Sequence, residues 1–296
     1  MKMTLDCIPC FVRQALESAR SMTSDPTAQE AVMRDTLRWL HEADLDESPL
    51  VLSQRLHRRL RQSGKLTDPY REVKARHNAM ALDLLPQLRD EIASSGDPLA
   101  TAVCMAAAGN VIDMGIRSMA DEDDVLKSLR HAMEEPFVAQ WDAFRRSLQD
   151  ARTILYLADN AGEIAFDRLL IEQIGPSRVT VAVRGGPVLN DATLSDARSV
   201  GLHKIAEVVE NGSDAPGTLL DNCYPEFRKR FEAADMVIAK GQGNFESLAG
   251  RGHGVFFLFK VKCPVVASQV GQPVGTHILG QFKESAHPGK PEKDVA

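Results

Sequence analysis

Oxygen-donor side chains stand directly after two short apolar runs in the second half of the sequence. Asp159 and Asn160 follow the run 154–158, and Asp191 comes shortly after the run 179–183. Carboxylate and carboxamide oxygens are hard donors, which suit Mg²⁺ or Mn²⁺ better than a soft metal. An isolated Asp-Asn pair at a strand end more often caps the following helix, so the metal hypothesis depends on the groups that gather around it.

Lysine and glycine follow the later apolar runs. The segment Lys240-Gly241-Gln-Gly243-Asn244 comes after 236–239, and Lys260 and Lys262 come after 255–259. Lysine supplies positive charge, and the Gly-Gln-Gly turn leaves backbone N–H groups open to a ligand. A metal, lysines and exposed amides together are suited to holding a phosphoryl group. Each glycine-rich loop taken alone is equally consistent with a structural turn.

Three further polar residues accompany this cluster. Asn110 and Asp113 lie in the apolar segment 99–116, which predicts a buried central helix with both side chains on one face. Because a buried carboxylate needs a partner, we interpret the two as pocket residues, with a satisfied pair in the core as the alternative. Glu163 begins the segment 163–174 and is either a general base or a capping acid. The N-terminus of that helix also favours an anion.

These residues belong to a region in which short apolar runs alternate with helical segments. The alternation is typical of a parallel or mixed sheet with helices on both faces. Ligands bind such sheets beyond the carboxyl ends of the strands, and nearly every predicted strand is followed there by polar, glycine-rich sequence. The predicted strands are 154–158, 179–183, 205–209, 236–239 and 255–259, and the predicted helices between them are 163–174 and 218–233.

The first half of the chain predicts helices, because a capping residue followed by proline marks several helix starts. We therefore predict an α/β fold with a helical N-terminal domain at 1–148 and an α/β metal-binding domain at 149–282. The charged segment 283–296 contains two prolines and predicts a flexible tail. The pairs that mark helix starts are Asp25-Pro26, Ser48-Pro49, Asp68-Pro69 and Asp97-Pro98.

Charge and composition restrict the partners. The 296 residues include 35 basic and 41 acidic side chains, and this net charge of -6 disfavours nucleic acid and anionic membranes. The N-terminus shows no apolar stretch of about 7–15 residues as in a signal peptide. No window reaches the roughly 18 apolar residues of a membrane span. We expect a cytoplasmic protein that acts on a small molecule, whereas the oligomeric state is not predicted.

Other phosphate-binding motifs are excluded. The sequence contains no Gly-x-x-x-x-Gly-Lys-Ser/Thr loop. The Gly241-Gln-Gly243 turn is followed by Glu246, where a dinucleotide fingerprint needs glycine or alanine. The acidic segment 121–124 follows the end of a predicted helix, whereas the nucleophile loop of a haloacid-dehalogenase phosphatase must follow a buried strand.

Cys7 and Cys10 form a Cys-x-x-Cys pair near the N-terminus. A zinc site needs four ligands, and the pair has too few partners nearby. Cys263 joining the pair in space and a redox-active pair are the alternatives. We favour a structural role for all three cysteines.

Several sequence blocks together resemble the damage-control phosphatases, a metal-dependent family long catalogued as a domain of unknown function. They begin near the N-terminus, extend to about residue 270 in the expected order, and include the Cys-x-x-Cys pair of the prokaryotic branch. The blocks are Cys7-Ile-Pro-Cys10, Gly109-Asn-Val-Ile-Asp113, Asp159-Asn-Ala-Gly-Glu163, 186–193, 212–218, Lys240-Gly-Gln-Gly-Asn244 and Lys260-Val-Lys-Cys-Pro264.

The resemblance implies a three-layer, Rossmann-like sheet domain with a helical N-terminal region and a metal at the sheet edge. It implies a phosphatase that removes phosphate from damaged or unwanted small metabolites, such as sugar phosphates and phosphopantetheine derivatives. Mn²⁺ or Mg²⁺ is the expected cofactor, with Co²⁺ or Ni²⁺ as alternatives. The implied metal ligands are Asp159, Asn160 and Asp191; the implied catalytic residues are Asp159 and Lys260; the implied substrate-binding residues are Asn110, Asp113, Glu163, Lys240, Gly241, Gly243, Asn244 and Lys260, with Lys262 as the alternative to Lys260.

Two other functions compete with this hypothesis. A methyltransferase that uses S-adenosylmethionine needs a glycine-rich loop directly after the first strand, where this chain has Asp159-Asn160. A non-catalytic metabolite-binding or redox protein built around Cys7 and Cys10 is the second alternative. Metal-stimulated release of phosphate from a generic phosphomonoester separates the phosphatase from both.

Overall fold

The computed structural model describes residues 1–64, 67–109, 122–251 and 254–282. Asn110 and Asp113 therefore lie outside the described residues, and so does the predicted tail at 283–296. Three of the predicted helix caps are present: Asp25 accepts a hydrogen bond from the backbone N–H of Thr27 at 3.0 Å, Ser48 accepts one from Leu50 at 3.4 Å, and Asp97 accepts one from Ala100 at 3.1 Å. The α-helices are α1 Cys7–Met22, α2 Pro26–Glu42, α3 Pro49–Gly64, α4 Arg71–Ser94, α5 Pro98–Ala108, α7 Glu122–Met133, α8 Trp141–Asp150, α9 Glu163–Ile174, α10 Leu194–Ser199, α11 Pro225–Ala233, α12 Gln242–Leu248 and α13 Pro264–Val270; short 3-10 helices span Pro176–Arg178, Leu202–Lys204 and Leu220–Asn222.

A mixed sheet lies at the centre of the fold. In the described residues it has seven strands in the order β1-β7-β6-β5-β2-β3-β4, and all neighbours pair in parallel except β6 and β7. Leu157 is in register with Ala182 on one side and Ala239 on the other, so the carboxyl ends of three strands are level. The strands are β1 Phe137–Ala139, β2 Ile154–Leu157, β3 Val179–Val183, β4 Glu207–Glu210, β5 Met236–Lys240, β6 Val255–Lys260 and β7 His277–Gly280.

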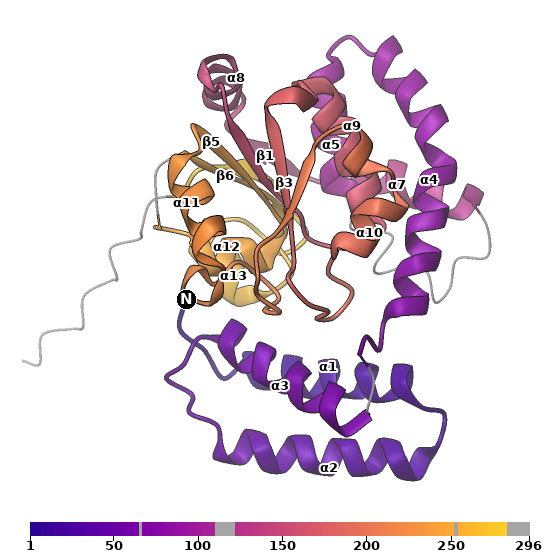
Figure 1. Cartoon of the computed structure of the whole chain (residues 1–296), viewed down its shortest axis with the longest axis vertical. Coiled ribbons are helices and arrows are strands. Elements are labelled where there is room, and N and C mark those ends of the chain that lie inside the picture. The colour runs from indigo at the N-terminus through magenta and orange to yellow at the C-terminus, as the bar shows by residue number, and fades with distance from the viewer. Residues whose placement is uncertain (65–66, 110–121, 252–253, 283–296) are drawn as a thin grey trace, which may run out of the picture.

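Helices cover both faces of this sheet, which confirms the predicted three-layer α/β fold (Figure 1). One face packs against α4, α5, α7, α8, α9 and α10, and the other packs against α11, α12 and α13. The five predicted strands are present, whereas β1 and β7 were not predicted. The predicted helix 163–174 is α9. The predicted helix 218–233 is wrong over 218–224, because α11 starts only at Pro225 and a short 3-10 helix at Leu220–Asn222 precedes it.

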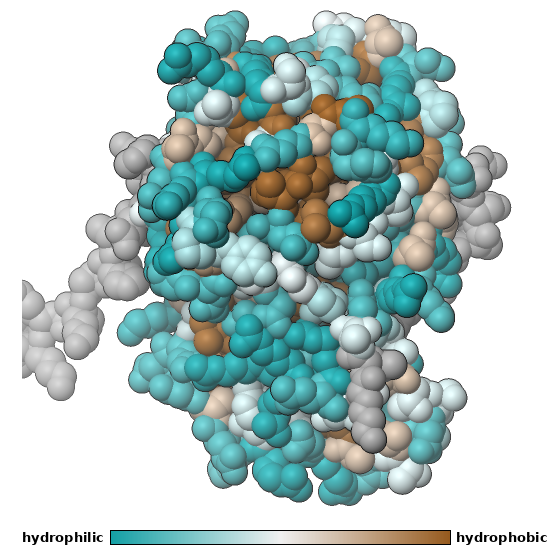
Figure 2. Space-filling view, in the orientation of Figure 1, coloured by the Kyte–Doolittle hydropathy of each residue, from teal (hydrophilic) through white to brown (hydrophobic). Residues whose placement is uncertain are grey.

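The first three helices form a separate layer at the carboxyl edge of the sheet (Figure 1). They have their own small core, which includes Phe11, Leu52 and Leu56. Helix α3 contacts the sheet-edge loops through charge, because Arg58 and Arg61 both pair with Asp214. Figure 2 shows a mostly hydrophilic surface over these three helices, with apolar side chains gathered higher on the same face, over the sheet and its helices. Among the described helices, none combines the length and apolarity needed to cross a membrane.

The predicted domain boundary at residue 148 does not coincide with a boundary between hydrophobic cores. Strand β1 precedes this residue and pairs with β7. Leu88 of α4 and Phe144 of α8 share one core with the strands of the sheet. Because α4, α5, α7 and α8 cover the sheet directly, the separate layer at its carboxyl edge comprises α1 to α3.

Candidate metal and phosphate site

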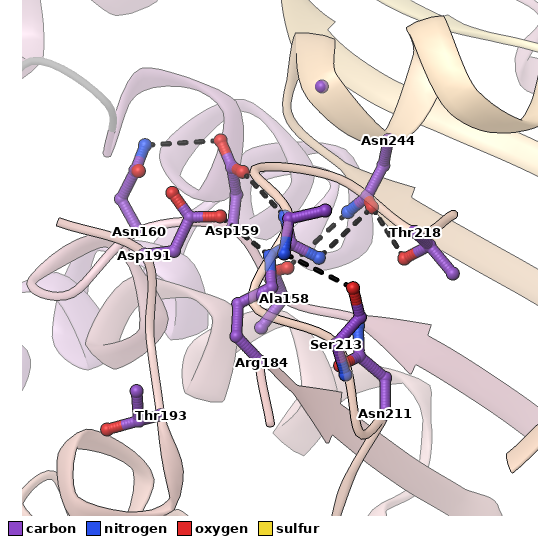
Figure 3. A network of polar contacts seen from close by, with 12 residues as sticks. Ala158, Asp159, Asn160, Arg184, Asp191, Thr193, Asn211, Ser213, Thr218 and Asn244 are labelled. Carbon is purple, nitrogen blue, oxygen red and sulfur yellow. Dashed lines mark hydrogen bonds and ion pairs between the residues drawn. The ribbon is translucent and has the colours of Figure 1, made fainter. Parts of the chain in front are cut away.

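The three predicted metal ligands lie together at the carboxyl edge of the sheet (Figure 3). Asp159 and Asn160 follow β2, and the loop after β3 crosses in front of them with Asp191. The two segments are joined by an antiparallel bridge between Asn160 and Asp191 and by a hydrogen bond of 2.7 Å from the Ala192 N–H to the Asp159 carbonyl. Adjacent parallel strands thus bring together residues that are about thirty positions apart.

Glycine allows the next strand to approach this cluster. Gly241 has a φ of +81°, and a Cβ at this position would lie 2.0 Å from a carboxylate oxygen of Asp159. A Cβ on Gly243 would lie 2.0 Å from the carbonyl oxygen of Pro216. The N–H of Gly241 donates to the Leu258 carbonyl at 3.1 Å. Both glycines, predicted to bind substrate through their amides, therefore serve close packing, and the Gly241 amide is already hydrogen-bonded within the protein.

Arg184 links the two carboxylates, although no role was predicted for it. Its guanidinium donates to Asp191 at 2.6 Å, to Asp159 at 3.3 Å and to the side-chain oxygen of Asn244 at 3.2 Å. Arg184 is only 1% exposed. Asn244 also accepts from Thr218 at 2.8 Å and donates to the Lys240 carbonyl at 2.7 Å. The side chain of Asn244 therefore positions Arg184, which in turn contacts both carboxylates (Figure 3), and the predicted role of Asn244 in substrate binding stays a prediction.

Several carboxylates lie close together in this cluster, which favours binding of a cation. Burial raises the pKa of Asp159 well above its ordinary value, and the negative charges of Asp191 and Glu163 raise it further against Arg184. Burial likewise raises the pKa of Asp191, although Arg184 opposes this. A divalent cation between the two carboxylates would offset this crowded charge.

The donor set suits a small, hard cation. Within the described residues no three His, Cys, Asp or Glu side chains are grouped as a metal site, so the candidate donors are two carboxylates and one carboxamide. Mg²⁺ in particular retains several waters and is commonly held by one or two carboxylates together with substrate phosphate. Asp159, Asn160 and Asp191 therefore fit such an ion, whereas a soft metal would need thiolate or imidazole ligands.

Lys240 and Glu163 lie behind the cluster. Lys240 is fully buried and donates to Glu163 at 2.6 Å, to Asp167 at 2.5 Å and to the Ala106 carbonyl at 2.8 Å. Burial lowers the pKa of Lys240, but the two carboxylates outweigh burial and the net shift is upward. The geometry does not favour the predicted contact of Lys240 with phosphate, because its ammonium group already donates to three acceptors inside the protein. Glu163, predicted to bind substrate, is only 3% exposed and accepts from Lys240 and from Asn160.

A cavity of about 310 Å³ faces Asp159, Asn160 and Asp191, and we call it the site cavity. Its wall includes Lys262, whose side chain is exposed. Lys260, predicted to be catalytic, instead lines a neighbouring cavity and pairs with Glu135 at 2.6 Å. Of the two lysines, Lys262 is therefore the one that shares a cavity with Asp159, Asn160 and Asp191.

The helical layer forms the opposite wall of the site cavity. Cys7 and Cys10 of α1 line it, and Cys263 lines it from the far side. All three thiols are free and partly exposed. We predicted only a structural role for these cysteines, and the sequence did not indicate that they lie beside the site. They do so because α1 docks over the sheet edge. Cys10 accepts from Gln14 at 3.5 Å, and Cys263 accepts from Gln242 at 3.6 Å.

Replacing Cys7 and Cys10 together by serine is expected to preserve most metal-dependent turnover. Serine has nearly the same shape, and thiolates are poor ligands for a hard cation. Turnover of a phosphomonoester and metal content should stay within about threefold of the unchanged chain, since surface-type substitutions cost little. Loss of turnover in a folded, metal-loaded double variant would instead assign the thiols a chemical role.

A separate cavity of about 570 Å³ lies at the amino edge of the sheet, near the starts of β2, β3 and β4. Its wall includes Arg152, Arg178 and Glu207. Arg178 is held by backbone carbonyls, including that of Ala151 at 2.7 Å, and Glu207 pairs with Arg230. Because ligands bind α/β sheets at the carboxyl ends of the strands, the site cavity is the stronger candidate.

The sheet, its covering helices and the paired carboxylates define a three-layer α/β protein with an oxygen-donor site at the carboxyl edge. The profile of the damage-control phosphatase ARMT1-like domain matches residues 3–278. The chain belongs to this family, which confirms the resemblance seen in the sequence, and membership supports a phosphatase function.

Individual relatives agree with this assignment over almost the whole chain. A damage-control phosphatase from Archaeoglobus fulgidus is 35% identical, with 93% of this chain and 97% of the relative covered. A damage-control phosphatase from Pyrococcus horikoshii is 30% identical, with 96% and 99% covered. A crystal structure of a DUF89 family protein from Pyrococcus horikoshii superposes with a TM-score of 0.86 at 29% identity, covering 96% of this chain and 100% of the other.

Proposed function

We propose that this phosphatase depends on a divalent metal and hydrolyses phosphomonoesters of small, damaged or unwanted metabolites. The observation that carries the proposal is the pairing of Asp159 and Asp191 beside Asn160, with their pKa values raised by burial, at the wall of a cavity. Mn²⁺ or Mg²⁺ suits these donors, and Co²⁺ or Ni²⁺ is an alternative. Sugar phosphates and phosphopantetheine derivatives are candidate substrates.

The protein's own side chains have distinct parts in this proposal. Asp159, Asn160 and Asp191 hold the cation, which when bound supplies Lewis-acid stabilisation of charge on the phosphoryl oxygens. Arg184 fixes the two carboxylates, since it contacts both of them. Lys262 offsets negative charge on the phosphate from the cavity wall. The products are the free alcohol of the metabolite and inorganic phosphate.

The decisive experiment measures phosphate release by the full chain from p-nitrophenyl phosphate. The protein is stripped of metal with a chelator and assayed with Mn²⁺, Mg²⁺, Co²⁺ or Ni²⁺ added back in turn. We expect little release without metal and stimulation by at least one of these ions. Equal rates with and without metal would overturn the metal dependence. Absence of any release, together with tight binding of S-adenosylmethionine, would favour the methyltransferase alternative.

Two lysine variants test which lysine side chain contacts the phosphate of the substrate. Lys262→Ala is expected to lower kcat/KM for p-nitrophenyl phosphate by about ten- to a hundredfold, the usual cost of a hydrogen bond to a charged group. Lys260→Ala is expected to lose less, because this ammonium is already paired with Glu135. Circular dichroism controls for folding. The reverse order of the two losses would restore Lys260 as the phosphate ligand.

A further inference from the structure

A larger cavity adjoins the site cavity, and we call it the second cavity. It has a volume of about 670 Å³ and lies between α1, α4 and the loop after β6. Arg13, Asn190 and Lys262 line both cavities, so the two share a wall. A ligand bound at the metal cluster therefore has space to extend toward α4, and both volumes lie in the range of small-molecule sites.

The second cavity is lined by several positively charged side chains. Arg13, Arg76 and Lys262 line it, and all three side chains are exposed. Within the described residues, the salt bridges involve none of these three. Glu17 contributes an acidic side chain to the wall, and Lys260 is paired with Glu135. In a chain with a net charge of -6, this local excess of cations indicates an anionic ligand.

A buried histidine supplies a second, independent indication. His77 of α4 lines the second cavity and is only 3% exposed, yet its Nδ1 has no hydrogen-bond partner in the described structure. A buried polar atom without a partner is costly, so such atoms are normally paired with protein, water or ligand. Burial, with a smaller effect of Arg76, lowers the pKa of His77 to about 4. The ring is therefore neutral at pH 7 and carries one N–H donor.

We propose that the second cavity binds an anionic group at the far end of the substrate. The substrate class is then a small phosphomonoester that carries a second phosphate or a carboxylate, and Arg76, Arg13 and His77 recognise that second group. This inference depends on the proposed function, because the group to be cleaved must lie at the metal cluster. It adds a substrate requirement that the metal cluster alone does not impose.

The test compares substrates that differ only at the far end. Bisphosphates of a graded series of α,ω-alkanediols are assayed against the monophosphates of the same diols and against ω-phosphoalkanoates. We expect kcat/KM to be about tenfold or more higher for the best dianionic substrate, as one charged hydrogen bond provides. Whichever of the bisphosphate and the phosphoalkanoate gains more identifies the second group. No gain for either, at any chain length, would overturn the proposal.

The Arg76→Gln variant tests whether the higher kcat/KM of the dianionic substrate depends on the second cavity, and Arg71→Gln is its matched control. Arg71 is an exposed arginine on the same helix, outside the wall of the cavity. We expect Arg76→Gln to lower the ratio of kcat/KM for the dianionic substrate to that for the monophosphate by about tenfold, and Arg71→Gln to leave this ratio unchanged. An unchanged ratio in a folded Arg76→Gln protein would contradict the proposal.

A binding experiment separates failure of this inference from failure of the proposed function. Calorimetry with an α,ω-alkane bisphosphonate, which cannot be hydrolysed, measures binding without turnover. We expect Arg76→Gln to weaken this binding about tenfold. If the protein releases no phosphate from any substrate, the proposed function fails, and bisphosphonate binding alone then decides whether the second cavity takes an anion. Equal affinity of the unchanged protein and the Arg76→Gln variant for the bisphosphonate would exclude an anion site in the second cavity.

Discussion

Asp191→Ala is expected to release the divalent metal and to lower phosphomonoester turnover by at least about a hundredfold. The reason is that loss of a charged ligand weakens binding of the metal, which acts as the Lewis acid. Asp191 is one of only two carboxylates in the candidate donor set. Its removal leaves Asp159 and one carboxamide, too few strong donors for a hard cation. The substitution also removes the shortest contact of Arg184, at 2.6 Å, so the metal-free protein should lose stability.

Asp191→Asn is the matched variant that separates the two roles of this residue. Asparagine keeps an oxygen that accepts from Arg184 but removes the negative charge, so the loss of stability should be smaller than with alanine. The loss of metal and of turnover should remain. The measurements are elemental analysis, thermal melting with and without Mn²⁺, and turnover of p-nitrophenyl phosphate. An asparagine variant that keeps its metal and its rate would show that Asp191 only positions Arg184.

Lys240→Met is expected to lower the free energy of unfolding by about 3–5 kcal/mol, the usual cost of breaking a buried ion pair from one side. Lys240 is fully buried, and its loss would leave Glu163 and Asp167 without their cation. Burial already raises the pKa of Asp167 to about 6 with Lys240 in place. The folded-state pKa of Lys240 is raised, so its contribution is fully present at pH 7 and is lost only as pH rises through that value.

Lys260→Met is the matched control, with the same substitution on the neighbouring strand β6. Lys260 and Glu135 retain 13% and 24% side-chain exposure, and His277 also lies 2.7 Å from Glu135, so Lys260→Met should cost less stability than Lys240→Met. Urea unfolding at pH 7 compares the two variants. If Lys240 contacted phosphate, Lys240→Met would unfold like the unchanged protein and lose only turnover. That result would return Lys240 to the substrate site.

The grouping of Asp159, Asn160 and Asp191 could be predicted from the sequence because two local rules act together. Apolar runs of four or five residues predicted β2, β3, β5 and β6, and the polar residues after them fall at the carboxyl edge wherever the strands are parallel. Asp159 and Asp191 then meet across adjacent strands, as predicted. Strand β1 was not predicted because three residues carry too short a periodic pattern, and β7 was not predicted because only two of its four residues are apolar.

The roles of the basic residues depended on tertiary structure. A strand alternates its side chains between the two faces of the sheet, and the same residue type serves either face. Lys240 ends β5 on the face where α5 and α9 supply a carbonyl and two carboxylates, so it is consumed in the core. Lys262 lies just beyond β6 and stays exposed at the cavity wall. Nothing local to either lysine distinguishes the two.

The amino-acid sequence by itself determined the family, the α/β layers and the place of Asp159, Asn160 and Asp191, because these depend on local periodicity and on residue order along neighbouring strands. Tertiary structure alone decided that Arg184 joins the carboxylates, that Cys7 and Cys10 line the site cavity, and that Arg76 and His77 line the second one. The contacts of Arg184 depend on how the loops after β2 and β3 pack against each other. The lining of the two cavities depends on how α1 and α4 dock over the sheet edge, and no spacing in the sequence predicts that docking.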